Sequence, residues 1–286
     1  MHIRTRIADA WSRRRGLVTG LGLAAMLAAC GTTYALAPVG EAHRAQAAAL
    51  FAQARGAPLP SFRPPSEAAA RFERVVTRVR PVAESFCRRE TADRPGFRCD
   101  AAFVMDWGDP SVNAYMAYRH GDTGGQPGVI LTPGILAGVQ NDDELAFVLG
   151  HEYGHLIGRH HQKRDQQRLA GALILGALAA AGATGDPAAD RRAVEDGVRL
   201  GHDLGTRAYS QTFELESDAI GAAIARAAGY DPVRGVRFFT RAYPSTTAGG
   251  RLSFWGTHPP DAARVATVIA AVEEFEAGGG LRRTGR

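Results

Sequence analysis

Two histidines and a glutamate lie within just over one helical turn in the sequence His151-Glu152-Tyr153-Gly154-His155. Residues at positions i and i+4 share one face of a helix, so both imidazoles can reach one zinc ion at about 2.0–2.1 Å. Glu152 would lie beside the metal, where it can take a proton from an activated water and pass it to a leaving amine. The pattern predicts a zinc site with a general base, and a solvated helix face is the alternative.

A catalytic zinc needs a third protein ligand and an open position for water. Glu214 and Asp218 are again four residues apart, in the middle of a second long helical stretch. We expect Glu214 to be the ligand and Asp218 to hold a ligand imidazole by its other nitrogen. Glu216 is expected to point elsewhere, into solvent.

Further patterns accompany these residues. They are Asn113-Ala114, Gly128–Leu136, Asp143–His151, Tyr209-Ser210, Asp218–Gly221 and Thr257-His258-Pro259-Pro260 with Arg264. With the zinc pattern they resemble, over residues 66–270, the gluzincin endopeptidases of the HtpX, CAAX-prenyl-protease and BepA family. Gln211 stands where that family commonly has Arg, and Ser217 where Ala is usual. Neither is an expected ligand, so the zinc assignment is unaffected.

The resemblance implies an edge strand around Asn113 and Ala114, along which an extended substrate pairs by its backbone. It also gives His258 as a loop histidine that can approach the zinc, either to cap it in a resting state or to steady the oxyanion. A histidine that simply lies near the site is the plain alternative. The implied substrates are misfolded or misassembled envelope proteins. His160 and His161 are expected to belong to packing or solvent.

The N-terminus resembles a lipoprotein signal. A basic stretch that ends at Arg15 precedes the uncharged run Gly16–Ala29, which is too short to span a membrane. Leu27-Ala28-Ala29-Cys30 resembles a bacterial lipobox, so we expect a signal peptide over residues 1–29 and lipid on Cys30. No Asp follows Cys30, which by resemblance to Gram-negative lipoproteins favours the outer membrane, on its periplasmic face. An ordinary secretory signal is the alternative.

The other two cysteines, Cys87 and Cys99, would then lie in an oxidising compartment. A pair of cysteines tends to form a disulfide there. We predict a Cys87–Cys99 bridge that joins the end of a helix to the next strand.

The elements that must position the site follow from periodicity, caps and breakers. Asn141 and Glu144 form a capping-box pattern ahead of the zinc helix, and Gly154 inside it indicates that something packs closely there. The expected strands are 101–107, 112–118 and 128–131. The expected helices are 41–55, 66–89 with an interruption at Pro81, a short one from Pro133, one from Asn141, 190–229, one from Pro232, and 261–276.

Residues 169–185 carry no charge and are rich in Ala and Gly. We expect a buried helix or a helical hairpin. An element that dips into a membrane is the alternative.

The chain has 286 residues and a net charge of +5, and residues 1–29 contribute five arginines against one aspartate. The remainder is nearly neutral, which gives no reason to expect nucleic-acid binding. We expect an α+β, mostly helical, zincin-like metallopeptidase domain over residues 66–276, a tether over 30–65 and a disordered tail over 277–286. The competing class is a chaperone-like or scaffold lipoprotein with a structural zinc, which would have no need of Glu152.

Overall fold

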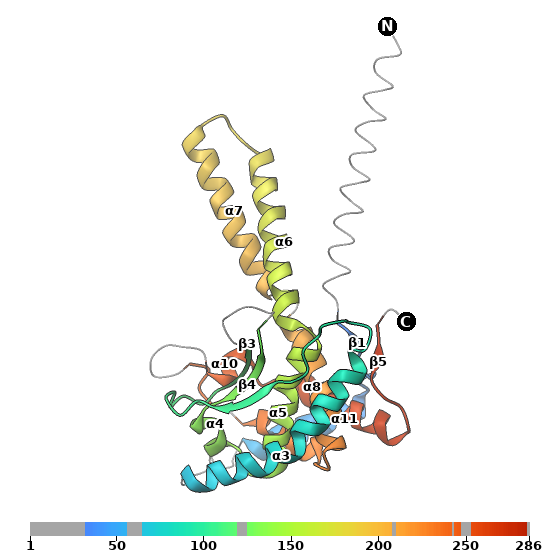
Figure 1. Cartoon of the computed structure of the whole chain (residues 1–286). Coiled ribbons are helices and arrows are strands. Elements are labelled where there is room, and N and C mark those ends of the chain that lie inside the picture. The colour runs from blue at the N-terminus through green and yellow to red at the C-terminus, as the bar shows by residue number, and fades with distance from the viewer. Residues whose placement is uncertain are drawn as a thin grey trace. The chain divides into compact units, whose positions relative to one another are not determined.

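The computed structural model describes residues 32–55, 65–118, 125–207, 210–241, 243–246 and 253–284. The chain divides into two compact units, which we describe separately. The body comprises residues 32–160 and 211–284 of the described chain, and the hairpin unit comprises residues 161–207. The expected α+β, mostly helical class is confirmed (Figure 1).

The body contains a three-stranded sheet in the order β2 (Ala102–Met105), β4 (Pro127–Leu131) and β3 (Ala114–Tyr118). β2 runs parallel to β4, and β3 runs antiparallel to it with Ala114 opposite Leu131. The three expected strands are therefore confirmed. β3 lies at an edge of this sheet, as its predicted role requires.

Two helices precede the sheet, α2 (Glu41–Ala54) and α3 (Pro65–Glu90). α3 runs through Pro81 without a break, so the expected interruption is wrong. Proline inside a helix costs about 3 kcal/mol because a backbone hydrogen bond is lost. Val75, Val79 and Ala83 of the same helix are fully buried, and burial on this scale offsets that cost.

The zinc-pattern helix is α5 (Asp142–Ile157), which follows the short α4 (Pro133–Gly138). The Asn141 side chain accepts a hydrogen bond from the backbone N–H of Glu144, as the capping pattern predicts. The Glu144 carboxylate accepts from Gln140 rather than from Asn141, and it also pairs with Arg241. Every residue of α5 from Glu144 onward is buried, so its polar side chains must find partners inside the protein.

The C-terminal part of the body is helical. It contains α8 (Ser210–Ala227), α9 (Pro232–Gly235), a 3-10 turn over Val236–Thr240, α10 (Phe254–Thr257) and α11 (Ala262–Glu276). Asp231 and Asp261 cap α9 and α11 with their side chains. The helix expected over 190–229 is described as two, with α7 ending at Arg207 and α8 beginning at Ser210.

The two ends of the described chain pair with each other. β1 (Tyr34–Ala35) lies antiparallel to β5 (Arg282–Arg283), and the Thr284 N–H donates to Thr33 O at 2.8 Å. Tyr34 is fully buried and donates its hydroxyl to Glu90 at 3.0 Å. The expected tether and disordered tail are therefore wrong for these residues, because each end is held by the other.

Cys87 at the end of α3 and Cys99 ahead of β2 form a disulfide, with Cα atoms 5.7 Å apart. The predicted bridge is confirmed. It closes a loop of 12 residues' separation between α3 and the sheet, so it fixes where β2 begins relative to the core helix.

The hairpin unit is formed by α6 (His160–Ala181) beyond its first residue and by α7 (Pro187–Arg207). Glycines let the two helices approach, since a Cβ added at Gly171 would lie 2.1 Å from Gly201 O. The predicted hairpin is confirmed (Figure 1), but the predicted burial is wrong, because Leu169, Leu173 and Leu178 are each more than half exposed. Among the described helices, none has the length and hydropathy needed to cross a membrane.

Candidate metal centre

Two close helix contacts bring the zinc-pattern helix against α8. A Cβ added at Gly150 would lie 2.9 Å from Gly221 O, and one at Gly154 would lie 2.9 Å from Ser217 Cα. Contacts this short leave no room for a side chain, so the helices meet backbone to backbone. The packing inferred from Gly154 is confirmed, and it sets the face of α5 that carries the histidines opposite Glu214.

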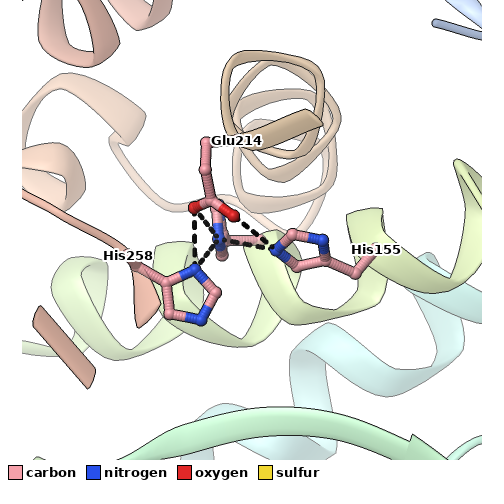
Figure 2. Close-up of side chains that lie close together, drawn as sticks. His155, Glu214 and His258 are labelled. Carbon is pink, nitrogen blue, oxygen red and sulfur yellow. Dashed lines mark hydrogen bonds and ion pairs between the residues drawn. The ribbon is translucent and has the colours of Figure 1, made fainter. Parts of the chain in front are cut away.

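Four buried side chains converge here: His151 and His155 from α5, Glu214 from α8, and His258 from the end of α10. One ligand atom from each lies within 4.8 Å of all the others. Figure 2 shows His155, Glu214 and His258 pointing toward a common centre. His151 Nε2 lies 3.1 Å from His155 Nε2 and 3.2 Å from His258 Nδ1.

These donors fit a small cation. Tetrahedral zinc with bonds of about 2.0–2.1 Å sets its ligand atoms about 3.3 Å apart. Each of His151 Nε2 and His155 Nε2 lies 3.4 Å from an oxygen of Glu214. His258 Nδ1 is closer to the carboxylate, 2.7 Å from Glu214 Oε2. Imidazole nitrogens with one carboxylate are a donor set that zinc favours, so His151, His155 and Glu214 could hold it.

Glu152 lies beside this cluster and outside it. The residue is buried, and its Oε1 has no hydrogen-bond partner within the described residues. His258 Nε2 lies 3.5 Å from that oxygen. A buried carboxylate oxygen without a hydrogen bond is costly, which points to a role for this group in chemistry rather than in folding.

Asp218 and Arg264 lie behind His151. His151 Nδ1 is 2.8 Å from Asp218 Oδ1, so its Nε2 is left to face the cluster. Arg264 donates to both oxygens of Asp218 at 2.7 Å, and its guanidinium carbon lies 3.9 Å from the centre of the Phe239 ring. The planar guanidinium holds the carboxylate in a two-point contact that fixes its orientation.

The charges of the cluster follow from burial and neighbours. Burial lowers the pKa of His155 well below its ordinary value, so this imidazole is neutral. Burial also acts to lower the pKa of His151, but the carboxylates of Asp218 and Glu214 raise it to about 9. Burial opposes ionisation of Glu214 too, yet His258, Arg264 and the hydrogen bond with His151 hold its pKa well below the usual range. A cation that binds His151 Nε2 must therefore displace a proton.

Glu216 departs from expectation, and His160 follows the first of its two expected alternatives. Glu216 is fully buried rather than solvated, and it accepts backbone hydrogen bonds from Thr33 and Tyr34. His160 is buried as well, with its Nδ1 2.9 Å from His155 Nδ1 and its Nε2 2.9 Å from Glu216 Oε2. Packing therefore describes His160 better than solvent does, and both residues reach the back of the cluster.

The predicted edge-strand residues lie at the start of β3. Asn113 and Thr132 exchange backbone and hydroxyl hydrogen bonds at 2.9–3.0 Å, and Asn113 Oδ1 is buried without a partner in the described chain. The N–H of Phe254, the first residue of α10, donates to Val112 O at 2.9 Å. The short helix that carries His258 is thus tied to the segment leading into the edge strand. Cys30, the expected lipidation site, lies outside the described residues.

His151, His155 and Glu214 lie buried on two tightly packed helices, which is the arrangement that zinc-dependent peptidases with a His-Glu-x-x-His helix require. The pattern of peptidase family M48 matches residues 70–272, and the chain belongs to that family. The resemblance drawn from the sequence is thereby confirmed at the level of the family.

Curated relatives cover a smaller part of the chain. The chain is 32% identical over 106 residues to the beta-barrel assembly-enhancing protease of Yersinia pestis, and 33% identical over 107 residues to that of Escherichia coli (strain K12). Each match covers 36% of this chain and 22% of the relative. The chain therefore matches only about a fifth of the length of these relatives.

Proposed function

We propose that this protein is a zinc-dependent endopeptidase. The observation that carries the proposal is the convergence of His151, His155 and Glu214 with His258, beside a buried Glu152 whose Oε1 accepts no hydrogen bond within the described residues. These three ligands leave a fourth position, which a catalytic zinc needs for water and which His258 Nδ1 lies close enough to occupy. A structural zinc would have no use for a buried carboxylate beside its ligands, so Glu152 is what favours a catalytic zinc.

In this proposal His151, His155 and Glu214 hold the zinc, which when bound activates water and polarises the peptide carbonyl. Glu152 accepts the proton that the attacking water releases and returns it to the nitrogen of the leaving amine. Asp218 keeps the His151 proton on Nδ1, so that Nε2 presents its lone pair. The carbonyl oxygen of the substrate becomes negative during attack, and a nearby hydrogen-bond donor, together with the zinc, would stabilise this charge.

The purified chain tests this function with an unfolded substrate such as casein. We expect cleavage to stop when a chelator removes the metal and to return as zinc is added, reaching a plateau at one zinc per chain. Cleavage that persists in the metal-free protein would overturn the proposal.

The proposed setting is the outer membrane, with the protein held at its periplasmic face by lipid on Cys30 and acting on misfolded envelope proteins. The lipobox-like sequence supports the anchor, and the relatives' name, beta-barrel assembly-enhancing protease, supports the substrates. We propose residues 1–29 as the signal peptide and 66–276 as the peptidase domain. The edge strand β3, near Asn113 and Ala114, would pair with extended substrate.

His258 is proposed to cap the metal in a resting state. Its Nδ1 lies among the ligand atoms, where it would fill the position that water needs. We expect His258→Ala to raise casein cleavage several-fold with zinc content unchanged, because the competent state no longer competes with the capped one. Cleavage that falls instead, with zinc retained, would assign His258 to the oxyanion.

Asp218 offers a test of ligand support. We expect Asp218→Asn to weaken zinc affinity about 10–100-fold, the usual effect of losing the partner of a ligand imidazole. Arg264 would also lose its charged partner, so the melting temperature of the metal-free variant must be measured alongside. Unchanged zinc affinity in a stably folded variant would remove Asp218 from the account.

A further inference from the structure

A second chain of hydrogen bonds stands behind His155, matching the Asp218 contact behind His151. It runs from His155 Nδ1 to His160 Nδ1 at 2.9 Å, and from His160 Nε2 to Glu216 Oε2 at 2.9 Å. The Ser217 hydroxyl also lies 3.1 Å from His160 Nδ1. All four side chains are buried, so these contacts are shielded from water.

The backbone is built to place His160 there. α5 ends at Ile157, and Arg159 adopts a left-handed conformation with φ of 56°, which turns the chain before His160 begins α6. A Cβ at Gly158 would lie 2.2 Å from His160 Nε2, so only glycine leaves room for the ring. The ring of Phe213 stacks on His160 with centroids 4.6 Å apart.

Glu216 is held in place by hydrogen bonds to both of its carboxylate oxygens. Its Oε1 accepts hydrogen bonds from the backbone N–H groups of Thr33 and Tyr34, at 2.5 and 2.7 Å, and its Oε2 faces His160. Backbone donors cannot reverse their role. Oε1 is therefore fixed as an acceptor, and Oε2 is the oxygen left to pair with His160.

The proton positions along this series of hydrogen bonds follow from Glu216 as the acceptor. A carboxylate oxygen of Glu216 accepts, so a neutral His160 would carry its proton on Nε2, facing Glu216, and a lone pair on Nδ1. That lone pair accepts the hydrogen of His155 Nδ1. His155 Nε2 is then left without a proton and faces the cluster of ligand atoms.

We propose that His160 and Glu216 are positioning residues that fix the tautomer and ring orientation of His155 for metal binding. The inference rests on the proposed zinc site and extends it. Two carboxylates of α8 would act in parallel, Asp218 on His151 directly and Glu216 on His155 through His160. The N-terminal segment at Thr33 and Tyr34 is then part of the support of the metal site.

Glu216→Gln tests the proposal because it keeps size and shape. If the amide nitrogen of the new side chain faces His160, it donates a hydrogen bond and needs a lone pair on His160 Nε2. The His160 proton then moves to Nδ1, where it meets the proton on His155 Nδ1. If it faces the other way, it opposes two backbone donors. We expect zinc affinity, measured by competition with a chelator, to fall about 10–100-fold.

Glu144→Gln is the matched control. Glu144 is also a fully buried carboxylate that accepts from a backbone N–H, but its partner is Arg241. We expect it to lower the melting temperature of the metal-free protein and to leave zinc affinity unchanged. The inference requires that Glu216→Gln lowers zinc affinity more than Glu144→Gln does, when the losses of melting temperature in the two variants are taken into account.

The outcomes separate the two proposals. A wild type that binds no zinc would overturn both the function and this inference. A wild type that binds zinc and a Glu216→Gln variant that binds it equally well would overturn this inference alone.

A second readout does not depend on affinity or activity. Long-range ¹H–¹⁵N spectra of the zinc-loaded protein report which nitrogen of each imidazole carries the proton. We expect Nε2–H for His160 and Nδ1–H for His155. A proton on His160 Nδ1 would overturn the inference even if zinc binds and peptides are cleaved.

Discussion

Glu152→Gln is expected to lower casein cleavage at least about 100-fold, because an amide of the same shape cannot accept the proton of the attacking water. The same variant should still hold one zinc per chain, since Glu152 is outside the set of ligand atoms. Its buried Oε1 has no hydrogen-bond partner to lose in the described chain, so the fold should tolerate the change.

Glu152→Gln is best compared with its parent in the His258→Ala background as well as in the wild type, so that a capped site does not hide the difference. Zinc content and melting temperature are measured in all four proteins. If both parents bind zinc and neither cleaves any unfolded substrate, the structural-zinc scaffold is the better account. If Glu152→Gln cleaves as fast as its parent, another base does the work.

Glu214→Ala is expected to lose the metal itself. The variant removes a carboxylate that lies 3.4 Å from the Nε2 atoms of both His151 and His155. Removing a ligand should cost more zinc affinity than removing a ligand's partner, which is about 10–100-fold, so we expect a loss above about 100-fold. Cleavage should fall to the level of the chelated wild type.

Glu273→Ala provides the matched control for that loss. Glu273 also pairs with a histidine, His43, but it lies on the exposed face of α11. We expect zinc content and cleavage to be unchanged in this variant. A Glu214→Ala protein that keeps one zinc, measured after dialysis against a weak chelator, would remove Glu214 from the ligand set.

The local parts of the fold follow from the sequence because local chemistry decides them. The Asn141 cap, the strand around Ala114 and the helix start at Pro232 each depend on neighbours a few residues away. The convergence of Glu214 with the two histidines of α5 follows from helical periodicity once two helices are assumed to face each other. Gly154 carries the signal that they do.

The parts that escaped prediction depend on contacts between distant segments. Pairing of Tyr34 with Arg283 joins the two ends of the described chain and leaves no local pattern. Glu216 lies two positions from Glu214, which on an isolated helix suggests a different and solvated face. The structure fills that face with His160 and the N-terminal segment.

One signal for His160 was present in the sequence. Gly158 followed by a charged residue breaks the helix soon after His155, and a break there can turn the next histidine back toward the site. Helical periodicity assumes an unbroken helix, and on such a helix His160 would not lie beside His155. Exposure of Leu169 and Leu173 was missed for a related reason, because an uncharged run indicates burial without naming what covers it.

Anomalous diffraction from crystals of the zinc-loaded protein, recorded on both sides of the zinc absorption edge, tests the proposed site most directly. We expect one anomalous peak about 2.0–2.2 Å from His151 Nε2, His155 Nε2 and a carboxylate oxygen of Glu214. A zinc peak elsewhere, or none at this cluster after loading, would contradict the proposed site.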